Sequence, residues 1–159
     1  MELKPHPEGG YFKEPYRSDL TISKEGLSNH YSGSRVASTA IYFLLTKEEH
    51  KSYLHKLKSD EIFHLYDGGS VEILLLYPSG DGAIQTLGSD LEKGERPQVL
   101  IPKGTWFGGL LKRTAQHALI GCTVAPGFEF EDFTLEIPKD LVARYSGFSE
   151  MIEALMFKK

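Results

Sequence analysis

The sequence predicts a mainly β fold, a sandwich or barrel of short strands that ends in short helices. Between residues 36 and 137, stretches rich in β-branched and aromatic residues are separated by Gly/Pro turns, a pattern typical of two-sheet and barrel folds. After residue 138, the apolar residues of DLVARY and SEMIEALMF recur at spacings of three and four, as they do on one face of a helix. The length of 159 residues fits one domain.

Within this single domain, residues 1–159, we expect three main parts. The N-terminal arm, residues 1–19, contains three aromatic residues in HPEGGYFKEPYRSD, and we expect it to be ordered because disordered tails are poor in aromatics. Residues 20–35 are rich in Ser and Gly and predict a loop. The barrel then spans about residues 36–137. Helices span about residues 138–159, with Pro138 in a first helical turn and Ser149 as a cap.

Strands are expected at nine places in the barrel, namely residues 36–46, 53–58, 61–67, 71–78, 83–88, 98–102, 105–111, 116–126 and 128–137. The first of them, VASTAIYFLLT, predicts a strand buried on both faces. The last, FEFEDFTLEI, alternates apolar and acidic residues, which predicts one wet face and one dry face.

Composition and charge argue against several classes of protein. The net charge is -4 and the longest basic cluster is Lys112-Arg113, whereas a nucleic-acid partner demands a basic face. The start, MELKPHPEGG, lacks the apolar core of a signal peptide, and no apolar run approaches the ~18 residues that span a bilayer. We therefore expect a cytoplasmic protein without a membrane partner. Cys122 is the only cysteine, and in LIGCTVAP it is more often a buried core residue than a nucleophile.

The candidate catalytic residues are His55, Glu61 and His64 in the stretch SYLHKLKSDEIFHLYDGG. A histidine and a carboxylate at hydrogen-bonding distance in an apolar barrel form a general acid–base pair, and desolvation raises the pKa of such a carboxylate. His64 has the opposite strand parity to Glu61, so it joins them only if a bulge turns it inward. The alternative is a buried His55–Glu61 pair that only fixes the fold. We favour function, because buried charge is costly and tends to mark sites.

Candidate ligand-binding residues are the aromatic and polar residues of the barrel strands: Tyr42, Phe63, Gln98, Trp106, Phe107 and His117. Stacked aromatic rings with a few directed polar groups suit a sugar-like or aromatic ligand, although aromatics in a β-barrel are more often part of the core. Glu14 and Arg17 either line a pocket or pair at the surface, and we expect the surface pair because exposed ion pairs are common. His30 falls in the predicted loop and is expected to be solvated.

Five blocks, taken in order, resemble the DUF985 (Cupin_5) family of the cupin superfamily: HPEGGYFKEPYRS, AIYFLL, LKSDEIFHLYDG, IPKGTWFGG and GCTVAPGFEFEDF. The resemblance runs from about His6 to Leu135. It implies a double-stranded β-helix, the RmlC-like jelly-roll barrel, usually as a homodimer, in a family whose members are mostly of unknown function. The fold is also similar to that of metal-free dTDP-sugar epimerases, and this analogy makes His55 or His64 the base and a tyrosine the acid.

The resemblance also bears on metal binding. Typical metal-binding cupins carry His-x-His and Glu in the first motif and a third His in the second, but Leu57 and Phe107 occupy two of these four positions. The resemblance leaves His55 and Glu61, which would be weak alone, with His64 or His117 as a third ligand only if it turned inward. A divalent metal is therefore the less favoured expectation.

Two classes of function remain open. In the first, the protein is an isomerase or epimerase that acts on a sugar-like or other small polar substrate by His/Glu acid–base chemistry. In the second, it is a non-catalytic cupin that binds a metabolite or, weakly, a divalent metal. A metal-dependent enzyme such as a dioxygenase is a third, less favoured option. In each case we expect a small-molecule ligand, and we expect a homodimer because the apolar arm and strands predict an edge covered by a partner.

Overall fold

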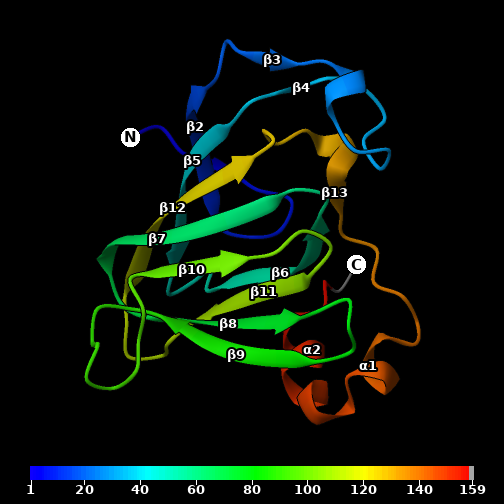
Figure 1. The fold of residues 1–159 in the computed structure, drawn as a ribbon. Coiled ribbons are helices and arrows are strands. Elements are labelled where there is room, and N and C mark those ends of the chain that lie inside the picture. Colours follow the sequence, from blue (N-terminus) through cyan, green and yellow to red (C-terminus); the bar gives the residue numbers. More distant parts are fainter. Residues whose placement is uncertain (158–159) are drawn as a thin grey trace.

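Two antiparallel sheets form the body of the protein (Figure 1), whose computed structural model describes residues 1–157. The strand order is β1-β2-β5-β12-β7-β10 in the six-stranded sheet and β13-β6-β11-β8-β9 in the five-stranded sheet, while β3 and β4 form a separate pair. The strands are β1 (Lys4–Pro5), β2 (Tyr11–Arg17), β3 (Thr21–Ile22), β4 (Arg35–Val36), β5 (Thr39–Thr46), β6 (Lys51–Leu57), β7 (Asp60–Gly68), β8 (Val71–Leu76), β9 (Gly82–Leu87), β10 (Gln98–Ile101), β11 (Trp106–Leu111), β12 (His117–Ala125) and β13 (Phe133–Thr134). The predicted mainly β fold is confirmed.

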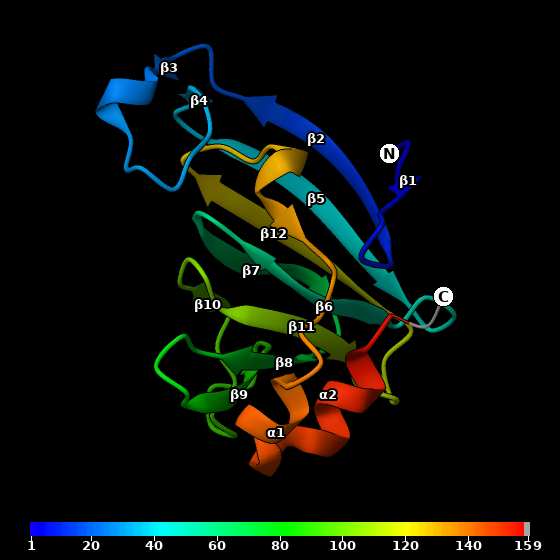
Figure 2. The same cartoon turned by 90° about the vertical axis from the view of Figure 1, so that its right-hand side faces the viewer.

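Two apolar cores hold the elements together. The larger core lies between the sheets, because alternate residues of each strand point inward, and includes Phe43, Phe63, Ile73, Leu75, Phe107 and Ile120. The smaller core lies between the five-stranded sheet and the helices α1 (Leu141–Arg144) and α2 (Ser149–Leu155), and includes Leu54, Leu74, Leu76 and Trp106. Figure 2 shows both helices at the end of the molecule away from β2. Burying one such side chain contributes roughly 1.5–3 kcal/mol, so the helices are held by packing.

A β-bulge in β6 directs two polar residues to the same side of the sheet. Phe107 of β11 pairs with His55, but Gly109 pairs with Ser52, so β6 has one extra residue over this interval. Without the bulge, residues three apart would point to opposite faces. Gly108 lies opposite the bulge, and a Cβ there would meet the Ser52 carbonyl oxygen at 2.7 Å. The bulge therefore requires glycine at this position and places Ser52 beside His55.

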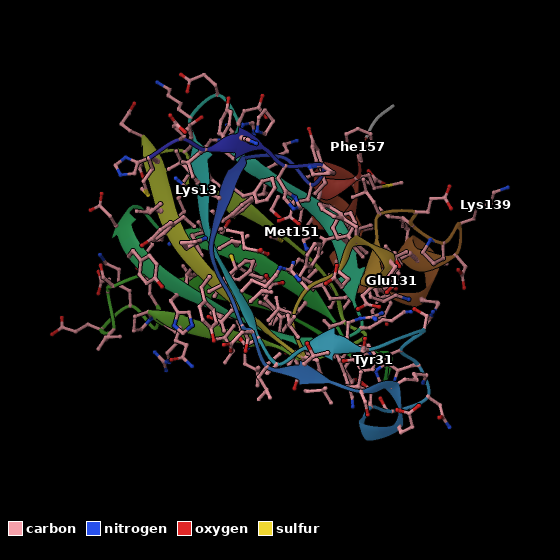
Figure 3. All side chains as sticks on the ribbon, turned by 90° about the horizontal axis from the view of Figure 1, so that it is seen from above. Lys13, Tyr31, Glu131, Lys139, Met151 and Phe157 are labelled. Carbon is pink, nitrogen blue, oxygen red and sulfur yellow. The ribbon has the colours of Figure 1, made fainter. Side chains whose placement is uncertain are left out.

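The predicted strand over residues 128–137 is wrong for most of its length. A 3-10 helix covers Phe130–Asp132, and only β13 is extended in strand pairing. Asp132 breaks the apolar–acidic alternation because its carboxylate is buried and accepts from Nε and Nη2 of Arg35 at 2.6 and 2.8 Å. Glu131 accepts from the hydroxyl of Ser32 at 2.7 Å, and Figure 3 shows Glu131 near the loop that carries Tyr31.

Smaller differences concern element ends. The strand β5 is not buried on both faces as predicted: one face carries the buried residues Thr39, Phe43 and Leu45, and the residues of the other face stay partly exposed. The predicted loop over residues 20–35 contains β3, a short 3-10 helix at Lys24–Gly26 and the start of β4. Pro138 lies three residues before α1, and Ser149 is the first residue of α2 and makes no capping hydrogen bond. Residues 158–159 of the expected helical segment lie outside the described residues. None of the helices within residues 1–157 has the length and apolarity to cross a bilayer.

Candidate functional site

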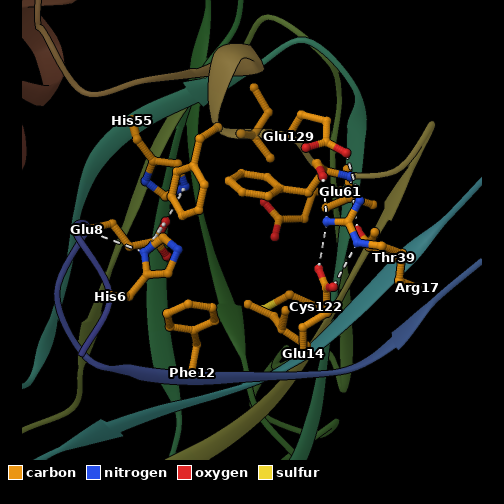
Figure 4. A pocket seen from close by; sticks show the side chains of 15 residues that line it. His6, Glu8, Phe12, Glu14, Arg17, Thr39, His55, Glu61, Cys122 and Glu129 are labelled. Carbon is orange, nitrogen blue, oxygen red and sulfur yellow. Dashed lines mark hydrogen bonds and ion pairs between the residues drawn. The ribbon is translucent and has the colours of Figure 1, made fainter. Parts of the chain in front are cut away.

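A cavity of about 80 Å³ lies between the sheets, beside the N-terminal arm (Figure 4). Its lining comes from the arm, β2, β5, β6, β7, β12 and the segment after β12: His6, Glu8, Phe12, Glu14, Arg17, Thr39, Ile41, His55, Leu57, Glu61, Cys122, Val124, Phe128, Glu129 and Phe130. His55 and Glu61 are thus brought into one cavity, and both are buried, with 1% and 6% of their surface exposed. Since one water needs roughly 10–15 Å³ of such space, the cavity holds on the order of five water-sized groups.

The N-terminal arm delivers His6 and Glu8 into this cavity. The arm turns sharply, with the His6 N–H donating to the Gly10 carbonyl at 3.0 Å and the Gly9 N–H donating to the His6 carbonyl at 3.0 Å. Gly9 and Gly10 have φ values of 94° and 65°, a left-handed backbone that glycine adopts without strain. The N–H of Tyr53 donates to the Glu8 carbonyl at 2.6 Å and so fastens the turn to β6.

A single proton lies between Glu8 and His55. The Nδ1 atom of His55 lies 2.7 Å from the Tyr53 carbonyl oxygen, and Nδ1 therefore carries a hydrogen because a carbonyl only accepts. Its Nε2 atom lies 3.1 Å from Glu8 Oε2. Two lone pairs at that distance would repel, so one of these two atoms is protonated. Ser52 donates to the other oxygen, Glu8 Oε1, at 3.1 Å. The Glu8–His55 pair is therefore neutral as a whole.

Burial decides which atom keeps the proton. Loss of hydration raises the pKa of Glu8 from 4.5 to about 8 and lowers the pKa of His55 from 6.5 to about 3. His6, whose Nδ1 lies 3.4 Å from Glu8 Oε2, has its pKa lowered to about 4 by the same cause. At neutral pH the proton therefore resides on Glu8, and both imidazoles are neutral.

Glu61 lines the same cavity from β7. Its Oε2 atom is fully enclosed and has no hydrogen-bond partner among the described residues. Burial, followed by the negative charge of Glu8 when that group is ionised, raises the pKa of Glu61 well above 4.5, which favours the protonated carboxyl, a hydrogen-bond donor. A buried polar atom left unpaired costs about 1–3 kcal/mol. The carboxyl group that carries this atom lines the cavity, so a turn of the side chain would let it pair with a water or ligand atom there.

The mouth of the cavity carries Arg17 between two carboxylates. Nε and Nη2 of Arg17 donate to Glu14 at 2.9 and 3.1 Å, Nη1 donates to Glu129 at 2.7 Å, and Nη2 also donates to the Phe128 carbonyl at 3.1 Å. Figure 4 shows this cluster across the cavity from Glu8 and the two histidines. The three charged side chains keep 29–41% of their surface exposed. The sequence allowed two interpretations of Glu14 and Arg17, a surface ion pair or the lining of a pocket. In the structure the two residues form an ion pair and also line the cavity.

His64 lies on the outer face of the six-stranded sheet, and the expectation that it joins His55 and Glu61 is corrected here. It alternates with the inward-facing residues of β7 and its ring stacks with that of Tyr66, 6.4 Å away. The register of β7 against β12 does shift, but between residues 65 and 67, which is too far along the strand to turn His64 inward. Tyr42 lies on this outer face as well, 6.1 Å from the Tyr66 ring, and does not line the cavity.

Among the other predicted ligand-binding residues, Phe63 and Phe107 belong to the core beside the cavity rather than to its lining. The Phe107 ring lies 4.1 Å from the His55 ring, so it holds that ring in place. Trp106 points the other way, into the core beneath the helices, because neighbouring residues on a strand face opposite sides.

Gln98 and His117 also lie outside the cavity. Gln98 is exposed at the start of the edge strand β10. Nε2 of His117 lies 2.9 Å from a carboxylate oxygen of Asp67 at the surface. His30 is exposed, as expected of a loop residue, and lies 2.8 Å from the Ser28 hydroxyl.

The donor set does not fit the metal site of typical cupins. Residues 1–157 contain no group of three or more His, Cys, Asp or Glu side chains arranged to hold a metal ion. Leu57 and Phe107 are apolar at two of the usual positions, and His64 lies outside the barrel. No step of a mechanism is therefore derived through a metal.

Sequence reasoning missed His6, Glu8 and Glu129 as cavity residues. The first two follow from the Gly9-Gly10 turn: a glycine pair that reverses the arm lays the residues just before it against β6. The aromatic residues of the arm predict that it is ordered, but they do not show which strand it crosses. Glu129 was assigned to the wet face of a strand that does not form.

An antiparallel jelly roll whose interior receives a histidine from one motif strand and a glutamate from the next is the fold of a cupin. The match to known proteins agrees with this class: residues 1–136 match the Cupin_5 family, described as Cupin superfamily (DUF985). The chain belongs to the Cupin_5 family, which confirms the resemblance and the jelly-roll fold.

Individual relatives support the assignment without naming an activity. The chain is 36% identical over 141 residues to "Uncharacterized protein YML079W" of Saccharomyces cerevisiae, covering 84% of this chain and 70% of that protein. A hypothetical protein from Leishmania major has a solved structure with a TM-score of 0.84 and 30% identity, covering 98% of this chain and 94% of that one. A mutant of oxalate decarboxylase from Bacillus subtilis has a TM-score of 0.58 at 18% identity, covering 99% of this chain and 38% of that chain, and shows the fold alone.

Proposed function

We propose that the cavity binds a small polar molecule and transfers a proton to or from it, as an isomerase or epimerase does. The observation that carries this proposal is the Glu61 carboxyl, which lines the cavity and whose Oε2 atom is enclosed without a partner. A fold does not retain an unpaired carboxyl for stability, because a well-packed apolar residue would avoid the cost. The natural partner of this carboxyl is therefore a ligand oxygen, which it meets when the side chain turns toward the open space.

Glu8 is the residue best suited to move the proton. A general acid or base works best when its pKa lies near the operating pH, and the pKa of Glu8 is about 8, compared with about 3 for His55. His55 then serves as the acceptor that orients the Glu8 proton through the 3.1 Å contact between Nε2 and Oε2. Glu61, protonated, donates a hydrogen bond to the oxygen next to the reacting carbon.

The size of the cavity restricts the substrate. Space for on the order of five water-sized groups encloses a fragment of a few heavy atoms and excludes a whole nucleotide-sugar. The part of the substrate that reacts is therefore small, and any larger part lies beyond the mouth at Arg17.

The test is a thermal-shift screen of small hydroxy and carbonyl compounds, followed by product analysis for each compound that stabilises the protein. We expect His55→Ala and Glu61→Gln to abolish turnover, and we expect Glu61→Gln, which keeps the shape of the side chain, to keep a melting temperature close to that of the wild type. The surface pair of His117 and Asp67 offers a control. His117→Ala removes an imidazole that lies outside the cavity and should leave turnover unchanged. A large loss of stability in both cavity variants with no effect on turnover would contradict the proposal.

A second candidate is binding without catalysis, and one observation favours it. Burial lowers the pKa of His55 to about 3 and raises that of Glu61 well above 4.5, so it favours the uncharged form of both groups, as in a receptor for a neutral polar group. A compound that stabilises the protein and is recovered unaltered, with no exchange of its hydrogens for deuterium in heavy water, would support this alternative.

We also propose that the protein forms a homodimer through the outer face of the six-stranded sheet. Tyr16, Tyr66 and Leu100 on this face are 51%, 57% and 52% exposed, and Tyr42 packs edge-on against Tyr66. An exposed cluster of this kind marks an interaction surface, and a two-fold contact covers it on both copies at once. A cytoplasmic location and the lack of a nucleic-acid partner remain predictions from composition.

Light scattering at micromolar concentration tests the dimer. We expect a dimer for the wild type and a monomer for Tyr66→Glu. In the control, Leu91→Glu, the charge replaces a residue that is 61% exposed in the turn after β9, and the dimer should persist. A wild-type monomer would refute the proposal.

A further inference from the structure

We propose that the ligand of this cavity is a small monocarboxylic acid with a hydroxyl or carbonyl oxygen, and that Arg17 binds its carboxylate in the place now taken by Glu129. This inference rests on the proposed binding function of the cavity and adds the class of ligand and the residue that selects it. Two observations at opposite ends of the cavity carry it: the guanidinium at the mouth and the unpaired carboxyl inside.

The first observation is the charge of the lining. Arg17 is the single Lys or Arg among the fifteen lining residues, and at neutral pH the inner ionisable groups are neutral. The one cationic group that an anionic ligand can contact in this cavity is therefore Arg17 at the mouth, because the groups inside are uncharged. Glu14 occupies the Nε–Nη2 edge of this guanidinium, so Nη1, which now contacts Glu129, is left to hold one ligand carboxylate by a charge-assisted hydrogen bond. No second cation in the lining is present to hold a dianion such as phosphate.

The second observation is the way Arg17 is held. Two carboxylates share its one positive charge, so the cluster of Arg17, Glu14 and Glu129 carries a net negative charge. Glu14 binds through two contacts, at 2.9 and 3.1 Å, whereas Glu129 binds through a single contact at 2.7 Å and is 41% exposed. Glu129 can turn into water at little cost, because exposed ion pairs are weak. It marks a position, beside the cavity, where a carboxylate already fits.

Exchange of one carboxylate for another at Arg17 is close to neutral in free energy. Net affinity must therefore come from the rest of the ligand, inside the cavity. There the Glu61 carboxyl needs an acceptor, which a hydroxyl or carbonyl oxygen supplies, and the rings of Phe12 and Phe128 supply apolar contact. A small hydroxy- or oxo-acid carries both required groups within a few heavy atoms.

The experiment compares each acid with its uncharged counterpart by isothermal titration calorimetry. Glycolate, lactate, glycerate and pyruvate are titrated into the wild-type protein, with the amide of each acid, propane-1,2-diol and inorganic phosphate as matched probes. We expect at least one of the acids to bind, and its amide and phosphate to bind at least about tenfold more weakly, as the loss of a charge-assisted hydrogen bond predicts.

Variants of the mouth separate this inference from the proposed function. Arg17→Gln should weaken the acid about tenfold or more, and Arg17→Lys should restore part of the affinity. Glu129→Gln should tighten binding by up to about fivefold, because the ligand no longer displaces a charged competitor. The control, Arg113→Gln, changes an exposed arginine in the turn before β12 and should have no effect.

Three outcomes would overturn the inference. Equal binding of the acid and its amide is one, undiminished binding by Arg17→Gln is another, and failure of all four acids to bind is the third. If a neutral diol binds, is lost in His55→Ala and is retained in Arg17→Gln, the carboxylate inference fails while the proposed cavity function stands.

Discussion

At the scale of single residues, the contact between Glu8 and His55 shows how backbone geometry fixes a protonation state. The Tyr53 carbonyl takes the Nδ1 hydrogen of His55, which leaves Nε2 to share a proton with Glu8. The sequence predicted His55 and Glu61 as a hydrogen-bonded pair; both line the cavity, but the carboxylate beside His55 is that of Glu8, and Oε2 of Glu61 has no partner. It did not find Glu8, because the contact joins positions 47 residues apart whose proximity depends on where the arm crosses β6.

Substitution of Glu8 should distinguish a missing hydrogen bond from a missing charge. In Glu8→Gln the amide can donate to His55 Nε2 and accept from Ser52, so we expect the free energy of unfolding to stay near that of the wild type. In Glu8→Ala both partners are left buried and unpaired, which should cost about 1–3 kcal/mol. Urea denaturation of the three proteins at pH 6 measures this, and equal stability of the two variants would contradict it.

At the scale of elements, the N-terminal arm and the bulge in β6 position the site, and each depends on glycine. A Cβ at Gly9 would meet the Lys51 carbonyl oxygen and the ring of Tyr53. The strands themselves were predictable from their apolar and β-branched composition. The 3-10 helix at Phe130–Asp132 was not, because the buried partner of Asp132 is Arg35, almost a hundred positions away.

Gly9→Ala should detach the arm from β6. Gly80→Ala is a matched control, because Gly80 has a similar φ of 99° but nothing within 4 Å of its added Cβ, whereas Gly9, at 94°, meets backbone. Both variants lose about 1 kcal/mol of stability to the strain of a left-handed residue. We expect only Gly9→Ala to lose more stability than this, and only Gly9→Ala to lose ligand binding. Thermal unfolding and calorimetry check the pair, and equal losses would show that the arm is not held by this contact.

At the scale of the whole molecule, four buried ionisable groups set how stability depends on pH. In the folded protein Glu8 and Glu61 hold protons and His6 and His55 do not. Between pH 4.5 and 6.5 the unfolded chain also holds two protons, on the histidines, so these groups leave stability unchanged there. Above pH 6.5 the unfolded chain releases both protons while the folded state keeps two. Below pH 4.5 the two carboxyl groups of the unfolded chain also bind protons, so the unfolded chain holds more protons than the folded protein and stability falls. The folded protein binds further protons only when His6 and His55 become charged, near pH 4 and pH 3.

We therefore expect maximal stability between pH 4.5 and 6.5 and a fall above pH 6.5, up to about pH 8. Each retained proton contributes roughly 1.4 kcal/mol per pH unit. Glu61→Gln removes one of the two retained protons. The free energy of unfolding of this variant should therefore fall with pH above 6.5 at about half the wild-type rate. Glu72→Gln, on the exposed side of β8, is the control and should keep the full slope. Urea denaturation at pH 5.5, 7 and 8 measures both slopes, and parallel curves for all three proteins would refute this assignment of charge.

The fold as a whole was predictable because five sequence blocks and the spacing of turns agree on a jelly roll. The site was only partly predictable. Strand parity places Glu61 correctly, but His64 was wrong as a candidate because no bulge turns it inward, and the arm and the mouth are assembled by contacts between distant parts of the chain.

Cys122 stands in the wall of the cavity and is the sole thiol of the chain. Burial raises the pKa of this thiol well above its ordinary 9.0, so a small uncharged thiol reagent should modify it only slowly, during openings of the cavity, and at this one position. The rate of this reaction reports occupancy directly, so a mixture of metabolites can be searched for the natural ligand by the protection it gives, before its chemical identity is known.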